Sequence, residues 1–140
     1  MKTLQPPGWP RPKGYSNGIA ARGTTIFVSG VVGWTAEEKF EAADLVGQVR
    51  QALANIVAIL AEGGAKPEHL VRMTWYLVDR NEYCAALREI GAVYREIVGR
   101  YYPTMTAVEV SGLIEPQARV EIEATAVIPD GHAAQEERTE

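Results

Sequence analysis

Two carboxylates stand one residue apart in the segment "RVEIEATAV", residues 119–127. Because successive side chains of a strand alternate between its faces, Glu121 and Glu123 share one face, roughly 6 to 7 Å apart. A partly buried carboxylate of raised pKa can serve as a general acid or base for an attacking water. A solvated strand face, with an intrastrand charge pair to Arg119, would give the same pattern. This strand alone therefore leaves both interpretations open.

A hydroxyl and a glycine end another short segment, "FVSG", residues 27–30. Small residues such as Ser29 and Gly30 let a ligand approach the backbone, although serine near a strand end is also common in ordinary turns. Tyr15 begins the preceding β-like segment, where a tyrosine more often packs than reacts. Each of these signals is weak when taken alone.

Thiol and imidazole groups are scarce, with one cysteine and two histidines in the chain. Cys84 falls on the apolar side of a helical pattern, which predicts a buried, unreactive thiol, and a single cysteine cannot form an internal disulfide. Of the histidines, His69 begins a predicted strand and His132 lies in a polar tail. A two-histidine metal site or a Ser–His pair has little to build from, so we expect no metal ion.

Length and charge restrict the class of protein. The 140 residues suit one domain, and 46% hydrophobic with 23% charged residues is an ordinary globular composition. The net charge is −4 and the fourteen Lys and Arg are scattered, unlike the basic surface of a nucleic-acid-binding protein. No apolar run approaches the roughly 20 residues that span a bilayer, and the Pro-rich beginning is unlike a signal peptide. We therefore expect a cytoplasmic protein without nucleic-acid or membrane partners.

Hydrophobic periodicity predicts the order β-β-α-β-α-β-β. The turn signal "RG" between the first two strands predicts a hairpin, and Gly63-Gly64 marks the end of the first helix. Asn81 is a suitable N-cap for the second helix. The first helix presents the apolar stripe Leu45, Val49, Leu53, Ile56 and Leu60, and the second presents Tyr83, Leu87, Ile90, Tyr94 and Ile97. The expected elements are strands at 14–21 and 24–30, a helix at 42–62, a strand at 69–79, a helix at about 81–99, and strands at 106–110 and 119–128.

Two amphipathic helices on one face of a mixed sheet are the economical packing of these elements, which is an α+β fold. The opposite face of the sheet is too apolar to stay in water over its whole area, so an oligomer is expected. We predict an irregular N-terminal arm at 1–13, a single domain at 14–129 and a flexible polar tail at 130–140.

Several segments, in this order and spacing, resemble one known family. The match runs from about Gly14 to Val127, and its most specific parts are "FVSG" and "VEIEATAV". The chain resembles the Rid family of reactive-intermediate deaminases, also called YjgF/YER057c/UK114. The segments that carry the resemblance are "GYSNGI", "IFVSG", "QVRQALANIVAILAEGGA", "VRMTWYLVDRNEY", "YPTMTAVEV" and "ARVEIEATAV".

This resemblance implies a chorismate-mutase-like fold and a homotrimer, in which the sheets form a central barrel and substrate clefts lie between subunits. It also implies cofactor-free hydrolysis of reactive enamines and imines, such as 2-aminoacrylate, to a 2-keto acid and ammonia. Matched residue by residue, the family motif assigns substrate contacts to Tyr15, Ser29 and Gly30. It assigns the carboxylate that positions the water to Glu121.

The sequence departs from that motif at Met105. Deaminating members have an arginine there, whose guanidinium binds the substrate carboxylate through two parallel hydrogen bonds. A thioether offers no such donors, and Ala107 and Val31 also replace residues that are commonly polar or thiol-bearing. Thr104 and Thr106 face away from Met105 by strand alternation, which favours a place for Met105 and Ala107 on the cleft wall. Plain packing beside the cleft is the alternative for Met105.

Three functions compete at this point. The first is an imine or enamine hydrolase whose substrate is not a small 2-imino acid, in a subgroup without the arginine. The second is a non-catalytic protein that binds a small metabolite in the same intersubunit cleft. The third is the endoribonuclease (L-PSP) or translation-inhibitor activity attributed to some members, which the acidic pI disfavours. Arg22, Arg72 and Arg119 are the alternatives for a replacement anion anchor.

Overall fold

Residues 1–131 are described by the computed structural model on which the following account rests. Of the polar tail predicted at 130–140, the residues from His132 on lie outside the described residues. Among residues 1–131, no helix is long and apolar enough to cross a membrane.

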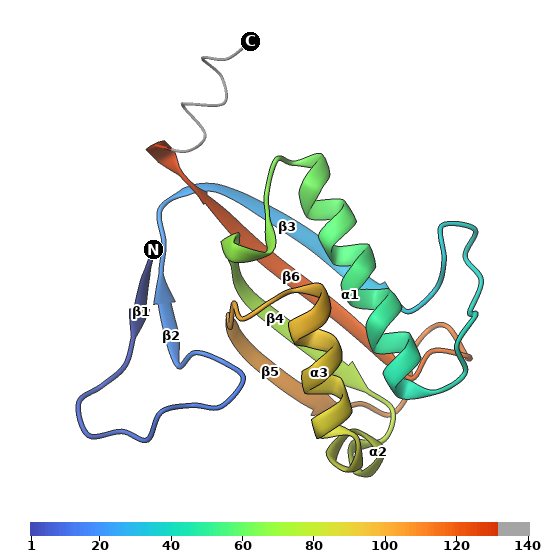
Figure 1. The fold of residues 1–140 in the computed structure, drawn as a ribbon. Helices are drawn as coiled ribbons and strands as arrows, with labels where there is room; N and C mark the ends of the chain where they lie inside the picture. The colour runs from blue at the N-terminus through green and yellow to red at the C-terminus, as the bar shows by residue number, and fades with distance from the viewer. Residues whose placement is uncertain (132–140) are drawn as a thin grey trace.

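A four-stranded mixed sheet forms the centre of the molecule (Figure 1). Its strand order is β3-β6-β4-β5, with β6 antiparallel to both neighbours and β5 parallel to β4. The α+β class with a mixed sheet is thus confirmed, and β3 and β5 form its two edges. The strands are β3 (Gly23–Val32), β4 (Leu70–Leu77), β5 (Thr104–Glu109) and β6 (Val120–Pro129).

Two helices, α1 (Leu45–Glu62) and α3 (Leu87–Ile97), lie side by side on one face of this sheet (Figure 1). Asp44 caps α1 by accepting a hydrogen bond from the Gly47 N–H at 3.0 Å. The helix ends at the predicted glycines. All five residues of its predicted stripe are buried in the single core, which confirms the periodicity argument: Leu45, Val49, Leu53, Ile56 and Leu60.

Strand β6 alternates as the sequence predicts. Its helix-facing side chains are buried, whereas Glu121 and Glu123 are half-buried on the opposite face. Arg119 departs from this prediction because it precedes the strand and pairs with Glu82 instead of with a carboxylate of β6. The buried residues of β6 include Val120, Ile122, Ala124 and Ala126.

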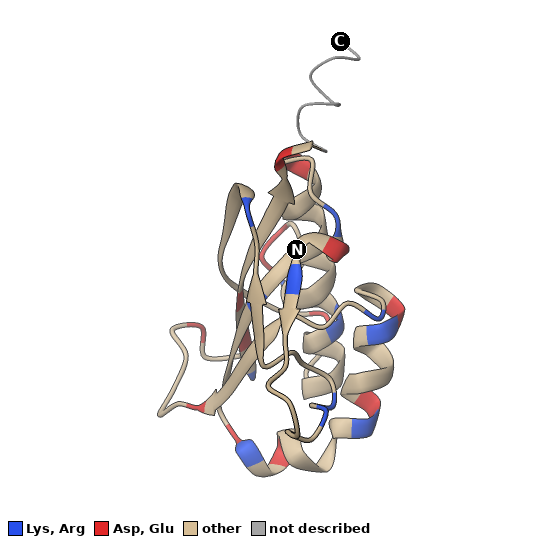
Figure 2. Ribbon diagram, turned by 90° about the vertical axis from the view of Figure 1, so that its left-hand side faces the viewer, with Lys and Arg blue, Asp and Glu red and all other residues tan. Residues whose placement is uncertain are grey.

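The opposite face of the sheet has no helix over it among the described residues (Figure 2). Phe27 is 80% exposed there, opposite Thr125 in the β3–β6 register. On the same face, the Tyr76 hydroxyl donates to Glu123 Oε1 at 2.6 Å, and this hydrogen bond raises the pKa of Tyr76. We call this surface the uncovered face. Apart from Phe27, its side chains on β6 and β4 are largely polar, among them Arg72, Thr74 and Thr125, so the prediction of an apolar face is wrong for these strands.

The N-terminal strands pair differently from the prediction. Strand β2 (Gly18–Ala20) pairs with β1 (Lys2–Leu4) in a separate two-stranded sheet, so the predicted hairpin between 14–21 and 24–30 is wrong. The irregular arm predicted for 1–13 also contains β1. At Gly23, φ is +146° and a Cβ would lie 1.8 Å from the Ile128 carbonyl oxygen. The chain therefore passes close against β6 at this point and pairs with it, instead of folding back on β2.

The second predicted helix is broken at Ala86 into α2 (Arg80–Ala85) and α3. Asp79, not Asn81, caps α2, because its Oδ1 accepts hydrogen bonds from the N–H groups of Asn81 and Glu82. The break interrupts the helical phase, so residues on its two sides do not share one apolar face. The prediction of a buried Cys84 is accordingly wrong, since Cys84 is exposed.

The same break affects the second predicted stripe. Ile90 and Tyr94 are buried, and Tyr83 and Ile97 pack against the core, but Leu87 is 50% exposed. The helix that follows the break therefore packs through its later turns.

Candidate functional site

A cavity of about 510 Å³ lies between α3, α2 and strand β5. This volume is within the range of about 300 to 1,000 Å³ that small-molecule sites occupy. Most of its walls are rings and apolar groups, and we call it the aromatic cavity. Six of its lining residues are Tyr15, Trp75, Tyr83, Tyr102, Met105 and Ala107.

Strand alternation brings Met105 and Ala107 to this cavity. Both line it from β5, and Met105 also packs against the hydrophobic core. Thr104 is anchored separately, through a hydrogen bond from its hydroxyl to the Val71 carbonyl at 2.7 Å. The wall that β5 contributes is thus a thioether and a methyl group, with no charged donor.

The aromatic walls are held by packing and by one short hydrogen bond. The rings of Tyr94 and Tyr102 stack with centroids 5.8 Å apart, and the Tyr94 hydroxyl donates to the Tyr101 carbonyl at 2.5 Å. Burial raises the pKa of Tyr94, so this hydroxyl keeps its proton in the fold. The rings of Trp75 and Tyr83 pack edge to face, with their centroids 6.2 Å apart. The buried Nε1 of Trp75 has no hydrogen-bond partner among residues 1–131.

A second cavity, of about 610 Å³, lies beside β3, β6 and α1. We call it the carboxylate cavity. A β-bulge shapes its rim, because β3 has one residue more than β6 between the pairs Val28–Ala124 and Val31–Ile122. Bulges of this kind re-aim side chains and are frequent beside ligand sites. Lining residues include Ser29, Gly30, Trp34, Asn55, Glu115 and Glu121.

Glu121 lies directly against Gly30 in this cavity. A Cβ added to Gly30 would be 2.7 Å from Glu121 Oε1, which is closer than real Cβ contacts. Glycine at this position therefore lets the carboxylate reach the exposed backbone of the bulge. A half-buried carboxylate beside a bulge can orient water next to a bound ligand. No group of three or more His, Cys, Asp or Glu suited to a metal ion occurs within residues 1–131.

The sequence-predicted site residues thus fall into two sets. Tyr15, Met105 and Ala107 meet in the aromatic cavity, and Ser29, Gly30 and Glu121 meet in the carboxylate cavity. The aromatic cavity lies at the β5 edge of the sheet and the carboxylate cavity at the β3 edge. These two strands are three interstrand spacings, or about 14 Å, apart. One protomer by itself does not bring the two sets together.

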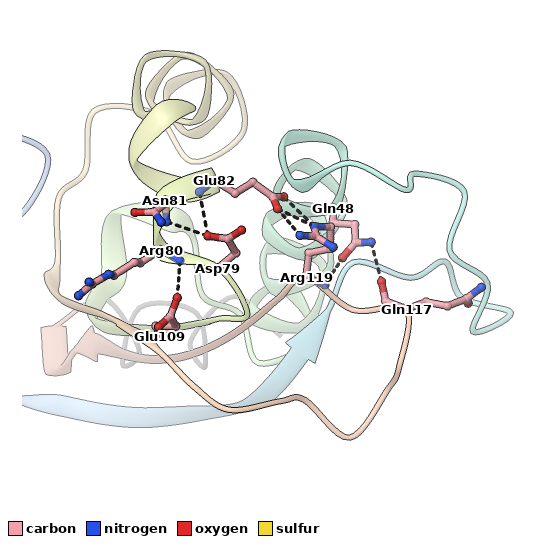
Figure 3. Close-up of polar contacts among 8 residues, drawn as sticks. All are labelled: Gln48, Asp79, Arg80, Asn81, Glu82, Glu109, Gln117 and Arg119. Carbon is pink, nitrogen blue, oxygen red and sulfur yellow. Dashed lines mark hydrogen bonds and ion pairs between the residues drawn. The ribbon is translucent and has the colours of Figure 1, made fainter.

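Of the arginines considered as replacement anchors, Arg119 has a structural role (Figure 3). Its guanidinium forms an ion pair with Glu82, and the hydrogen bonds that it donates to this carboxylate raise the pKa of Arg119. Its backbone N–H donates to Oε1 of the buried Gln48 at 2.7 Å. This network joins α2 and α1 to the start of β6, and it leaves Arg119 unsuited to hold a substrate anion.

Arg72 and Arg22 are not among the residues that line the aromatic cavity. Arg72 lines two other hollows: one on the uncovered face, and one between β2 and β5 that also reaches Met105. The basic residues that do line the aromatic cavity are Lys13 and Arg95, and neither was predicted. No motif distinguishes them from the other scattered basic residues. Trp75 was also missed as a site residue, because a tryptophan in a strand predicts packing.

Comparisons with known proteins identify relatives over nearly the whole chain. The family model described as Endoribonuclease L-PSP matches residues 10–128. A RutC family protein of Pyrococcus abyssi is 36% identical over 119 residues, which are 84% of this chain and 89% of that protein. The Escherichia coli protein named "Putative reactive intermediate deaminase TdcF" is 29% identical over 130 residues, 91% of this chain and 95% of its own.

Solved structures agree with these sequence matches. A Rid family protein of unknown function from Yersinia pestis, YyfB, has a TM-score of 0.79 and 30% identity, covering 91% of this chain and 98% of that one. TdcF, solved with bound serine, has a TM-score of 0.65 and 28% identity over 91% of this chain and 99% of its own. The fold and the two cavities define a small α+β protein of the YjgF type. The chain belongs to the Endoribonuclease L-PSP family, the Rid (YjgF/YER057c/UK114) proteins.

Proposed function

We propose that this protein is a cofactor-free hydrolase of a reactive imine or enamine, and that its substrate is not a small 2-imino acid. The observation that carries the proposal is the contact between Glu121 and the glycine of the β3 bulge, which holds a carboxylate beside accessible backbone. The reactive-intermediate deaminase name of a relative that matches 91% of this chain supports the reaction class.

The reaction adds water across a C=N bond. Glu121 orients the water and accepts its proton as oxygen attacks the carbon, while the nitrogen gains a proton. The resulting carbinolamine breaks its C–N bond and releases a carbonyl compound and ammonia. An enamine enters the same route after tautomerising to the imine. Such intermediates already hydrolyse in water, so positioning alone gives a useful acceleration.

The proposed site is a cleft between subunits of a homotrimer. The support is the separation of the two cavities at opposite edges of one sheet. A neighbouring copy that sets its β5 edge beside β3 would bring Met105 and Ala107 opposite Glu121. Tyr15, Ser29 and Gly30 would then contact one substrate from two subunits.

Substrate choice follows from the wall opposite the carboxylate. Met105 and Ala107 offer no donor for a carboxylate on the reacting carbon, and Arg119 is engaged by Glu82. A bulkier, more apolar substrate suits these groups. A non-catalytic metabolite-binding role would use the same walls. Charge disfavours RNA, since the net charge is −4 and the basic residues are scattered over the ribbon among acidic ones (Figure 2).

The test measures carbonyl formation from imines generated in solution, with parent protein, Glu121→Gln and Glu123→Gln. We expect Glu121→Gln to lose about a hundredfold or more in rate, because general-base groups contribute about that much. Glu123→Gln is the matched control, since its carboxylate lies on the same strand face but hydrogen-bonds Tyr76. A parent that accelerates no imine, yet binds such compounds, would favour the binding role.

A further inference from the structure

The aromatic cavity carries positive charge although the protein is acidic. Lys13 and Arg95 line it, and no Asp or Glu of residues 1–131 is among its lining residues. The net charge of the chain is −4, so this cavity is a local exception. A site lined by cations and apolar rings favours an anion attached to an apolar body.

Arg95 reaches the cavity over a glycine of its own helix. A Cβ on Gly91, one turn earlier in α3, would lie 3.2 Å from Arg95 Nη1. Gly91 is itself a lining residue, and glycine in a helix interior destabilises the helix relative to alanine. The missing side chain leaves the space in which the guanidinium lies back along the helix toward the cavity.

Among residues 1–131, Arg95 takes part in no ion pair, unlike Arg50 and Arg119. Arg50 pairs with Glu96 at 2.6 Å, and Arg119 pairs with Glu82. Within residues 1–131, no carboxylate lies within ion-pair distance of Arg95. Its planar guanidinium is thus available for two parallel hydrogen bonds to a ligand carboxylate.

We propose that Arg95, assisted by Lys13, binds a carboxylate at the far end of an aromatic imine substrate. This inference rests on the hydrolase proposed above and names its substrate class. Arg95 holds the carboxylate from α3, across the cavity from Met105 and Ala107. The aromatic ring of the substrate then lies between this carboxylate and the reacting C=N bond. A flat ring suits the intervening walls, because Trp75, Tyr83 and Tyr102 offer faces and edges to it.

The experiment compares two imines that differ only in that distal charge. The probes are the N-methylimines of benzaldehyde and of 4-formylbenzoate, each of which takes up one water and yields the aldehyde and methylamine. We expect kcat/KM to be about fivefold higher for the carboxylated imine, as suits a charge-assisted contact from exposed side chains. Arg95→Leu should remove this preference, mainly through KM, and Arg95→Lys should restore part of it.

Arg88→Leu is the matched control, because it removes the same charge from α3 at a residue that does not line the cavity. It should leave the preference unchanged. Equal kcat/KM for the two imines in the parent, or an equal loss on both in Arg95→Leu, would overturn the inference.

A binding measurement separates this inference from the hydrolase proposal. Isothermal titration calorimetry of the parent and of Arg95→Leu with 4-formylbenzoate and with benzaldehyde measures binding without turnover. Tighter binding of the carboxylate by the parent, lost in Arg95→Leu, would support the anchor even if neither imine were hydrolysed. Binding of 4-formylbenzoate no tighter than that of benzaldehyde would overturn it, even in a protein that hydrolyses imines.

Discussion

At the scale of single residues, the function proposed above gives Met105 the choice of substrate, because it lines the aromatic cavity without a charged donor. We expect the parent to hydrolyse small 2-imino acids poorly, because a bidentate contact to a desolvated carboxylate is worth about 3 kcal/mol, or roughly a hundredfold in rate. Met105→Arg should recover part of this activity, since both side chains have unbranched stems. Recovery stays incomplete because Ala107 and Val31 supply no polar group.

The measurement is keto-acid formation from imines that an amino-acid oxidase releases in the assay. Met105→Leu serves as the control, because it alters the same wall without adding a donor. A gain in Met105→Leu equal to that in Met105→Arg would attribute the effect to shape instead of charge. A parent already as fast as arginine-bearing relatives would contradict the role given to Met105.

Single residues were predictable here where one strand fixes their direction. Period-two alternation identified the shared face of Glu121 and Glu123 and the joint orientation of Met105 and Ala107. Arg95 was not predictable, because its access to the cavity depends on Gly91 and on the helix break before it. A basic residue on an amphipathic helix otherwise predicts only a solvated side chain.

At the scale of elements, the β3 bulge positions the candidate carboxylate. Gly30→Ala would place a Cβ 2.7 Å from Glu121 Oε1, and the flexible end of that side chain must move away. We therefore expect a loss of about tenfold or more in imine turnover, with little change in thermal stability. Gly112→Ala is the control, because nothing lies within 4 Å of its added methyl group. Full activity in Gly30→Ala would show that the carboxylate position is not critical.

The packing of α3 on the segment before β5 predicts a loss of stability at high pH. Burial raises the pKa of Tyr94 above its unfolded value of 10.0, so the folded protein keeps a proton that the unfolded chain releases. This contribution is fully present below about pH 10 and is lost as pH rises through the folded pKa. The free energy of unfolding should accordingly decline above about pH 10.

Tyr94→Phe should flatten that decline, while lowering stability at neutral pH by about 1 kcal/mol through the lost hydrogen bond to the Tyr101 carbonyl. Urea unfolding between pH 8 and 11 measures both effects. Tyr101→Phe, which alters an exposed ring beside it, is the control. An alkaline decline equally steep in Tyr94→Phe would assign the effect to other groups.

Individual helices and strands were predictable from local patterns in the sequence, but which strands pair with one another was not. The α1 stripe and the alternation of β6 follow from side-chain periodicity alone. The pairing of β2 with β1 depends on contacts between distant segments and on the close approach of Gly23 to β6. The break at Ala86 carries no glycine or proline, so the usual helix-stop signals are missing there.

At the scale of the whole molecule, the uncovered face and the separation of the two cavities both favour a closed ring of copies of the chain. Phe27 is 80% exposed on that face, among polar side chains of β6 and β4. The two cavities lie at the edges β3 and β5, about 14 Å apart. A closed ring of copies would cover the face and join edge to edge, and we expect light scattering to give three times the mass of one chain. A monomer mass at micromolar concentration would contradict this expectation.

Mixed assemblies test whether one site takes residues from two subunits. Glu121→Gln disables the carboxylate cavity and Ala107→Trp fills the aromatic cavity, so each variant alone should be inactive. If the two are unfolded together and refolded, random assembly gives about one quarter of the clefts two intact halves, and about one quarter of parent activity should return. The same mixture without unfolding is the control and should stay inactive. A site contained in one protomer would recover nothing in either case, because each chain then carries its own defect.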